Sequence, residues 1–325
     1  MALSIGSRAE AARLFEKSLG SEILDCMKDH AVEDLFLNAD GSCFARYSNR
    51  TERLKTTLSP EARFIIIGYA GSIIGTTADG VSRFTVDGKV HSGQRFHGVL
   101  PPRSVGGPYI VMRNPPRKVY RRADYVAQGV MTQEVSDGLE RCLIDKVNIV
   151  IPGVMGAGKT SLLTCLLNDP AAINDRIAKL EDTDEINIDA APNKVEKSTL
   201  GGTYSQLVYD VLRERVDRCI IGEGRDGGVW DWIKALAAVP GGSLITIHAD
   251  TLNTSMERLE QLCAEVVVDV AVQRPVLIRA VNRLVPIRLL PNGQRYVPGI
   301  YEPIRHNGNR YEFRTVYGTP AEDVL

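Results

Sequence analysis

The chain has 325 residues, which suggests two domains rather than one. An apolar content of 44% is enough for two sizeable cores. A formal net charge of −1 argues against a protein that binds nucleic acid through a large overall positive charge. The six cysteines are scattered without a CxxC pair, which favours free thiols in a reducing compartment over a disulfide framework or a zinc site. The N-terminus has no signal-peptide pattern, and the uncharged run at 64–78 is too short to span a bilayer. We therefore expect a cytoplasmic protein, for which any association with a membrane would be peripheral.

The first 117 residues are expected to form a small α+β domain, because a helix-then-strand order is combined with dense Pro and Gly punctuation. The predicted elements are a helix, two strands, a helix capped by Ser59 and two further strands, at 7–29, 32–37, 43–47, 59 onward, 92–99 and 108–113. A basic stretch, 117–122, leads out of this domain, and it is either a solvated linker or a surface that faces a ligand. We take 118–131 as the linker.

From Thr132 onward, helical and strand patterns alternate, which predicts a parallel sheet with helices on both faces and ligands at the carboxyl ends of the strands. After Arg274 the chain returns to short strands and turns, to which we assign no function. The predicted strands are 147–151, 176–180, 218–222 and 243–247, and the predicted helices outside the glycine loop are 132–145, 203–214, 226–238 and 251–263.

The glycine-rich stretch at 153–160 follows the strand 147–151 and precedes a helix with apolar periodicity, and it fits the P-loop pattern G-x-x-x-x-G-K-[ST]. Its glycines let successive backbone N–H groups turn toward an anion, and the helix N-terminus adds its dipole there. A chance glycine-rich turn is the alternative, and the strand-before, helix-after context argues against it. Lys159 would reach the β- and γ-phosphates, and the Thr160 hydroxyl would ligate Mg²⁺. The residues predicted to bind the nucleotide are Gly153, Gly156, Ala157, Gly158, Lys159, Thr160 and Ser161.

Three clusters of polar residues follow the P-loop, each where a predicted strand ends. The acidic loop 180–185 either helps to place Mg²⁺ and the attacking water or is solvated surface. Glu223 follows an apolar strand, at a position where P-loop enzymes place an acid that supports Mg²⁺ or orients water. His248 ends the strand 243–247, and a lone histidine there is either structural or part of the site.

The order of these four motifs resembles that of the type II/type IV secretion ATPase superfamily, hexameric motors that power pilus assembly, protein secretion and conjugation. The resemblance covers essentially the whole chain. It implies an α/β fold, with a RecA-like P-loop motor domain at 132–325 and a smaller N-terminal α+β, PAS-like domain at 1–117. It also implies ATP and Mg²⁺ as cofactors and a homo-hexamer. The implied partners are inner-membrane components of a secretion or conjugation channel, without direct sequence-specific binding of nucleic acid.

By motif, the resemblance assigns roles to residues outside the P-loop. Glu223 takes the position of the catalytic glutamate, and His248 takes that of the residue that senses the γ-phosphate. The stretch from Glu181 to Glu185 corresponds to the family's Asp box, which helps to place metal and water. Two arginines, Arg213 and Arg225, match family arginines that complete the site between subunits.

The resemblance also assigns a role to two arginines of the first domain, and the sequence departs from the family pattern at two places. By analogy to the type IV branch, Arg95 and Arg113 would reach nucleotide phosphates, and the alternative is that both are surface arginines on strands. Val154-Met155 replaces the usual Pro-Thr or Pro-Ser of the P-loop, and Gly224 replaces a larger residue after the catalytic glutamate. Neither change removes a functional group, but Gly224 could loosen its turn.

The function that the sequence favours is an ATPase that powers a type IV secretion or conjugation machine, for substrate translocation or pilus biogenesis. Thr183 is typical of that branch, whereas pilus motors more often carry proline there. A motor for pilus assembly or retraction is the first alternative. A RecA-like nucleic-acid motor is more distant, because the chain has no aromatic-plus-basic stripe for single strands. A scaffold that binds ATP without hydrolysis would not need Glu223.

Overall fold

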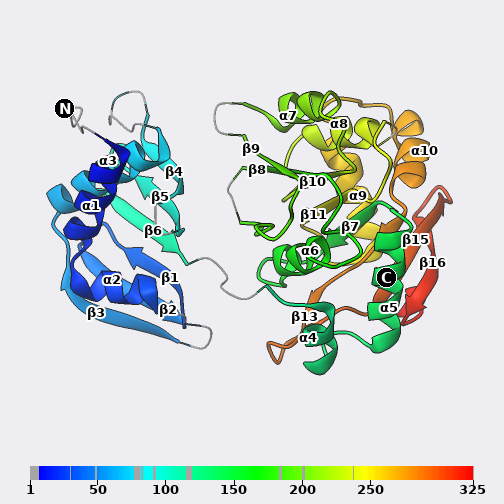
Figure 1. Cartoon of the computed structure of the whole chain (residues 1–325), viewed down its shortest axis with the longest axis horizontal. Helices are drawn as coiled ribbons and strands as arrows, with labels where there is room; N and C mark the ends of the chain where they lie inside the picture. Colours follow the sequence, from blue (N-terminus) through cyan, green and yellow to red (C-terminus); the bar gives the residue numbers. More distant parts are fainter. Residues whose placement is uncertain are drawn as a thin grey trace. The chain divides into compact units, whose positions relative to one another are not determined.

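The computed structural model describes residues 7–29, 31–47, 50–76, 81, 83–90, 93–114, 119–182, 185–199, 202–236 and 238–324. The chain forms two compact units, whose bounds are Met1–Arg117 and Lys118–Leu325 (Figure 1). Unit 1 has one sheet and one core, whereas unit 2 has a larger sheet with two cores and a separate hairpin.

Unit 1 is built on an antiparallel sheet whose order, over the described residues, is β3-β2-β1-β6-β5-β4. The helices and the sheet share one core, which includes Phe15, Leu35, Ile66 and Phe96. The strands are β1 Val32–Leu37, β2 Ser42–Tyr47, β3 Thr51–Thr57, β4 Thr85–Lys89, β5 Arg95–Val99 and β6 Tyr109–Arg113. The helices are α1 Arg8–Leu19, α2 Ser21–Lys28 and α3 Pro60–Ile74.

The helix predicted at 7–29 is wrong as a single element, because the structure divides it into α1 and α2. Gly20 lies between them with a φ of +79°, a conformation that glycine adopts without strain and that interrupts the helix. Ser59 caps α3 as predicted, since its hydroxyl accepts the N–H of Ala62 at 3.2 Å. The edge strand β3 was not predicted, because its residues TERLKTT are mostly exposed and show no apolar alternation.

Unit 2 contains a mixed sheet of order β16-β15-β12-β7-β11-β10-β8-β9 within the described residues. The strands from β12 to β9 in that order are parallel, and β15 and β16 add an antiparallel edge. The strands are β7 Ile149–Pro152, β8 Ile177–Glu181, β9 Lys194–Ser198, β10 Arg218–Ile221, β11 Leu244–Ile247, β12 Arg283–Leu284, β15 Gly299–His306 and β16 Tyr311–Gly318. The helices and the separate hairpin are α4 Arg122–Ala127, α5 Gln133–Ile144, α6 Lys159–Leu167, α7 Tyr204–Val211, α8 Gly228–Ala235, α9 Leu252–Cys263, α10 Val270–Ala280, β13 Arg288–Leu289 and β14 Arg295–Tyr296.

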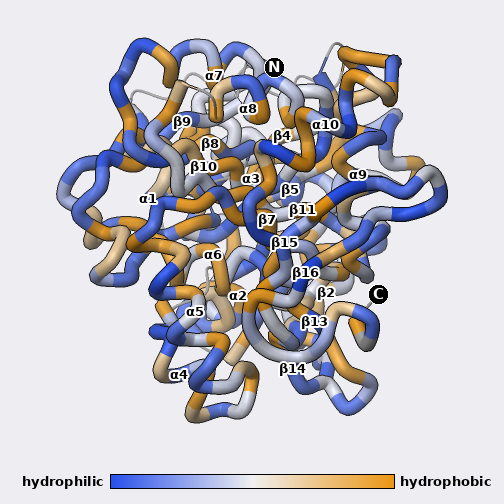
Figure 2. Tube along the Cα trace, turned by 90° about the vertical axis from the view of Figure 1, so that its right-hand side faces the viewer, coloured by the Kyte–Doolittle hydropathy of each residue, from blue (hydrophilic) through white to orange (hydrophobic). Residues whose placement is uncertain are grey.

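Alternate residues of the central strands face two separate cores, because successive side chains of a strand point to opposite faces. Val150 belongs to the core that includes residues of α7, α8 and α9, whereas Ile149 and Ile151 belong to the core that includes residues of α5 and α6. Figure 2 shows hydrophobic segments along the central strands β7, β10 and β11. The central strands are therefore buried on both faces, as the apolar runs predicted.

Two segments of unit 2 differ from the prediction. The stretch taken as a linker carries α4, and Arg122 of this helix donates to the buried Asp169 at 2.6 Å and to the carbonyl of Ser136 at 2.9 Å. Beyond Arg274 the chain is still helical, since α10 continues to Ala280 with Pro275 inside it. All six cysteines are free thiols, as predicted. Of the helices in the described ranges, none has the length and apolar character needed to pass through a membrane.

Candidate active site

The four sequence motifs meet at one edge of the parallel sheet. The strand β11 is paired with both β7 and β10, and β10 is also paired with β8. Since parallel strands end at the same edge, the P-loop after β7, the acidic loop after β8, Glu223 after β10 and His248 after β11 lie together there. This is the placement that the sequence predicted for a ligand site.

The P-loop has glycine where the backbone requires it. Gly156 and Gly158 have φ values of +77° and +98°, in the left-handed region. A Cβ on Gly153 would lie 2.6 Å from the carbonyl oxygen of Ile287, so a side chain there would force the neighbouring chain away. Gly158 is the N-cap of α6, which begins at Lys159, so the positive end of the helix dipole meets the loop. The local structure is that of an anion-binding loop.

Lys159 is buried, with 8% of its surface exposed, and its ammonium is held by the loop itself. Its Nζ donates to the carbonyl oxygens of Gly153 at 2.9 Å and Val154 at 3.2 Å, and it lies 3.2 Å from Nδ1 of His248. Burial lowers the pKa of Lys159, while the negative charge of Glu223 acts in the opposite direction. The site therefore contains a partly desolvated cation at the position where phosphates would bind.

Both oxygens of the Glu223 carboxylate are engaged by basic side chains. Nε2 of His248 lies 2.6 Å from Oε1, and Nη2 of Arg225 lies 2.6 Å from Oε2. Burial, together with the nearby charge of Lys159, lowers the pKa of His248. Because Nδ1 faces the ammonium of Lys159, it acts as the acceptor, and Nε2 carries the proton that is donated to Glu223. His248 thus joins the phosphate-binding lysine to the acid.

Arg225 extends this set of contacts to the acidic loop. Its second guanidinium nitrogen pairs with the carboxylate of Asp182, whose backbone N–H donates to the hydroxyl of Tyr204 at 3.1 Å. The contacts are thus continuous from Lys159 through His248, Glu223 and Arg225 to Asp182, and we call these five residues the charge chain. Asp182 was not among the acids singled out from the sequence, although its place in the acidic loop was the available signal.

Glu181 has a different place from Asp182, because it is buried below the loop. Its carboxylate accepts the backbone N–H groups of Glu185 at 3.2 Å and Ile186 at 3.1 Å, and Nζ of Lys179 lies 3.3 Å away. Burial raises the pKa of Glu181 to about 7, against the opposing effect of Lys179. A Cβ on Gly222 would lie 2.9 Å from Cγ of Glu181. Glu181 therefore shapes the acidic loop from within; Thr183 and Asp184 lie outside the described residues.

The sequence of residues 86–297 matches the family described as "Type II/IV secretion system protein". The chain belongs to this family of secretion ATPases. It is 32% identical to the conjugal transfer protein TrbB of Rhizobium radiobacter over 89% of each chain. It is 30% identical to a probable conjugal transfer protein TrbB of Sinorhizobium fredii over 95% of this chain and 94% of that one.

A solved structure confirms the predicted α/β fold of this secretion ATPase. The pilus retraction motor PilT with bound ADP has a TM-score of 0.63 to this chain, and the match covers 93% of this chain and 83% of that one. The sequence identity is 16%, so this likeness concerns the fold alone.

Three further arginines were predicted for the site of this secretion ATPase. Arg213 follows α7 and is exposed, with its guanidinium carbon 5.1 Å from the ring centroid of Tyr209, and within the described residues it forms no ion pair with the charge chain. Arg95 and Arg113 are in unit 1, where they are register partners on β5 and β6. Nε of Arg113 lies 3.2 Å from Oδ1 of Asp34.

Gly224 does not loosen its turn, contrary to the expectation from sequence, because the space for a side chain is filled. A Cβ there would lie 2.9 Å from Cγ2 of Val229, 3.0 Å from Cδ1 of Ile245 and 3.3 Å from Cγ2 of Ile247. Its N–H also donates to the carbonyl of Thr246 at 2.8 Å. The glycine therefore lets the chain after Glu223 pack closely against α8 and β11.

Gly224→Ala is expected to destabilise unit 2 by about 1–3 kcal/mol, because the methyl group overpacks this contact. Urea unfolding followed by tryptophan fluorescence measures the effect, since both tryptophans, Trp230 and Trp232, are in α8. In a Val229→Ala background, Gly224→Ala should lower the free energy of unfolding by less, and a double-mutant cycle measures this difference. An unchanged urea midpoint in Gly224→Ala would contradict the close packing.

One residue near the P-loop was missed by the sequence analysis. Nη2 of Arg295, on β14, donates to the carbonyl oxygen of Gly156 at 3.3 Å. It lies in the turn-rich region after Arg274, where no motif marked it.

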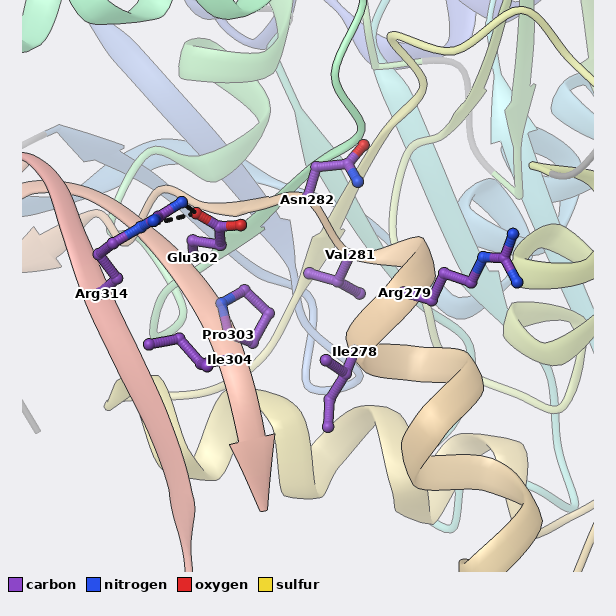
Figure 3. Close-up of a pocket in the computed structure, with 8 residues that line it drawn as sticks. All are labelled: Ile278, Arg279, Val281, Asn282, Glu302, Pro303, Ile304 and Arg314. Atoms are coloured by element: carbon purple, nitrogen blue, oxygen red, sulfur yellow. Dashed lines mark hydrogen bonds and ion pairs between the residues drawn. The ribbon is translucent and has the colours of Figure 1, made fainter. Parts of the chain in front are cut away.

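A separate hollow lies away from the charge chain, between the end of α10 and the antiparallel edge of the sheet (Figure 3). Arg314 of β16 pairs with Glu302 of β15 on one side of it, and the side chain of Arg279 points away from that pair. None of the residues predicted for the nucleotide site lines it; the lining residues are Ile278, Arg279, Val281, Asn282, Glu302, Pro303, Ile304 and Arg314.

Proposed function

We propose that this chain is the Mg²⁺-dependent ATPase of a conjugation machine of the type IV secretion class. It works as a homo-hexameric ring in the cytoplasm and is held peripherally to the inner membrane by components of the channel. The TrbB relatives, at 32% and 30% identity over most of each chain, support this branch over a pilus motor. The fold likeness to PilT does not favour a pilus motor, since it stands at 16% identity.

The charge chain is the observation that carries the proposed chemistry. It places a buried lysine beside a P-loop, and through His248 it joins that lysine to an acid that ends a neighbouring strand. The β- and γ-phosphates of ATP would replace the carbonyls of Gly153 and Val154 as partners of Lys159, with stronger, charge-assisted hydrogen bonds. Glu223 would then orient the attacking water, and catalysis would come mainly from positioning and electrostatics.

His248 would sense the γ-phosphate through the same contacts. In the structure its two ring nitrogens face Lys159 and Glu223, at 3.2 and 2.6 Å. A phosphate that draws the ammonium away from Nδ1 would change the hydrogen bonding of the ring and so of the acid on its other side. Binding of the nucleotide would in this way alter the restraint on Glu223.

The residues at this edge fit a magnesium ion. Mg²⁺ prefers oxygen ligands, keeps several waters and is often bound by one or two protein oxygens together with substrate phosphates. Thr160, in the first turn of α6, offers its hydroxyl, and the carboxylates of Glu223 and Asp182 belong to the charge chain. When bound, the ion would neutralise phosphate charge during the transfer. Thr160 would be its direct ligand, and the acidic loop would act through water.

The proposal of a ring follows from the negative charge that develops on the transferred phosphoryl group during hydrolysis. One subunit supplies the loop, Lys159 and the acid, and the outer oxygens of the transferred phosphoryl group still need a cation. Arg213 is exposed in the structure and is therefore available to a neighbouring subunit. Arg95 and Arg113 of unit 1 would contact the phosphates in the ATP-bound state, and hydrolysis would release them.

Lys159→Ala is expected to weaken ATP binding roughly 10- to 100-fold and to abolish measurable turnover, because a charge-assisted contact to phosphate is lost. Calorimetric titration with ATP and phosphate release with Mg²⁺ or with EDTA measure the two effects. The exposed Lys17 provides the matched control, and Lys17→Ala should leave both unchanged. ATP affinity that is unaltered in Lys159→Ala would refute the nucleotide site.

The same variant tests the machine. A donor cell whose chromosomal or plasmid copy of this gene carries Lys159→Ala should lose transfer of its conjugative element, while motility that depends on pilus retraction is unaffected. Loss of that motility with normal transfer would instead assign the chain to a pilus motor.

A further inference from the structure

A C-terminal segment lies against the P-loop, although it contains none of the four motifs. The N–H of Ile287 donates to the carbonyl of Pro152 at 2.9 Å, directly before the loop, and the carbonyl of Ile287 faces Gly153. The chain then forms the hairpin of β13 and β14, closed by the N–H of Leu290 donating to Gln294 at 2.8 Å. The hairpin therefore returns the chain to the P-loop at β14.

Arg295, on β14, is the residue that crosses the loop. Its Nη2 donates to the carbonyl oxygen of Gly156 at 3.3 Å. A Cβ on Gly158 would lie 3.2 Å from Cδ and 3.3 Å from Nε of the arginine. The side chain thus covers residues 156–158, the part of the loop whose backbone N–H groups a P-loop turns toward phosphate.

The guanidinium of Arg295 has N–H donors that are available for a ligand. It is exposed, and within the described part of the chain it makes that single hydrogen bond and no ion pair. A guanidinium carries five N–H donors in a planar fork that suits phosphate oxygens. The acids of this edge, Glu223 and Asp182, are already paired with Arg225. Arg295 is thus a second cation of the P-loop, placed apart from Lys159 and the residues that would surround the γ-phosphate.

We propose that Arg295 is a nucleotide-binding residue that contacts the α-phosphate of bound ATP and ADP. The assignment rests on the proposed function of the P-loop. Lys159, His248 and Glu223 occupy the side where the γ-phosphate would lie, whereas Arg295 covers the loop from Gly156 to Gly158, before the lysine. A contact to the phosphate that both nucleotides share raises the affinity for both and leaves the chemical step unchanged.

The test is nucleotide affinity in Arg295→Ala, Arg295→Lys and wild type, measured by calorimetry with ADP and with a non-hydrolysable ATP analogue. Arg295→Ala should weaken the binding of both nucleotides roughly 10- to 100-fold, as loss of a charge-assisted contact does. Arg295→Lys should restore much of the affinity, because it retains the charge. Arg310, exposed in the turn after β15, provides the control, and Arg310→Ala should bind both nucleotides as wild type does.

Each of four results would overturn the assignment. Unchanged affinities in Arg295→Ala would show that the arginine does not bind the nucleotide. A loss confined to the ATP analogue would place the contact at the γ-phosphate. A lower urea midpoint without nucleotide, with no recovery in Arg295→Lys, would make Arg295 a packing residue of the loop. Failure of the wild-type protein to bind either nucleotide would overturn the proposed function as well. The titration of wild type and Lys159→Ala with ATP distinguishes that failure from an error in the role of Arg295 alone.

Discussion

Glu223→Gln protein is expected to bind ATP with nearly the affinity of wild type and to hydrolyse it about 10²- to 10⁴-fold more slowly. The amide keeps the size of the carboxylate but neither carries its charge nor accepts a proton from water. The P-loop and Lys159 are unchanged, and Lys159 makes its contacts to the loop carbonyls independently of Glu223. Binding and turnover should therefore separate in this variant, whereas in Lys159→Ala they fall together.

Single-turnover hydrolysis and calorimetric titration of the same preparation measure the separation. Glu302, which pairs with Arg314 at the antiparallel edge of the sheet, provides the matched control, and Glu302→Gln should be as active as wild type. Because the substitution also removes the partner of His248 and Arg225, the urea midpoint is recorded alongside. Hydrolysis by Glu223→Gln at the wild-type rate would show that this acid does not orient the water.

Arg213→Ala protein is expected to be inactive alone and to regain partial turnover when it is mixed with Glu223→Gln protein. A positioned arginine contributes roughly 10³ to 10⁵ in rate in comparable phosphoryl-transfer sites. In a mixed ring, some interfaces combine an intact Glu223 from one subunit with an intact Arg213 from its neighbour. Turnover should therefore pass through a maximum as the mixing ratio is varied.

The structure supplies the control for this experiment. Arg225 contacts Glu223 of its own chain at 2.6 Å, which supports a role within one subunit, whereas Arg213 is exposed and apart from the charge chain. Arg225→Ala mixed with Glu223→Gln should consequently stay inactive, because every site lacks one of the two residues. Labelled subunits verify that exchange takes place. No recovery with Arg213→Ala under verified exchange would place that arginine in its own subunit's site.

The positions of the site residues at the strand ends could be predicted because short local sequence patterns mark where each strand ends. An uncharged β-branched run, a glycine loop and a helix follow one another at 147–168, and the motif residues after the other strands are adjacent to them in sequence. Parallel pairing then brings those ends together without further information. The helix cap at Ser59 could likewise be predicted, since its hydroxyl accepts the N–H of Ala62 in the first turn of its own helix.

The missed features depend on contacts between segments far apart in the sequence. Arg295 reaches Gly156 across 139 residues, and no local pattern distinguishes it from other exposed arginines. Glu181 and Asp182 have different contacts because their carboxylates lie on different sides of the loop. The sequence alone does not show which of two adjacent acids is the buried one. α10 was not predicted, since the chain was expected to return to short strands and turns after Arg274, yet this helix continues to Ala280 with Pro275 inside it.

Two backbone hydrogen bonds give the start of unit 2 a short mechanical connection to the nucleotide loop. The N–H of Ile287 is bound to Pro152, and ten residues later the N–H of Val297 is bound to Val130 at 2.7 Å. Val130 follows α4 in the first part of unit 2. A displacement of the P-loop that carries Ile287 with it must either break the bond at Val130 or pull on this part of unit 2. The segment after α4 is thus connected to the P-loop through the chain between Ile287 and Val297.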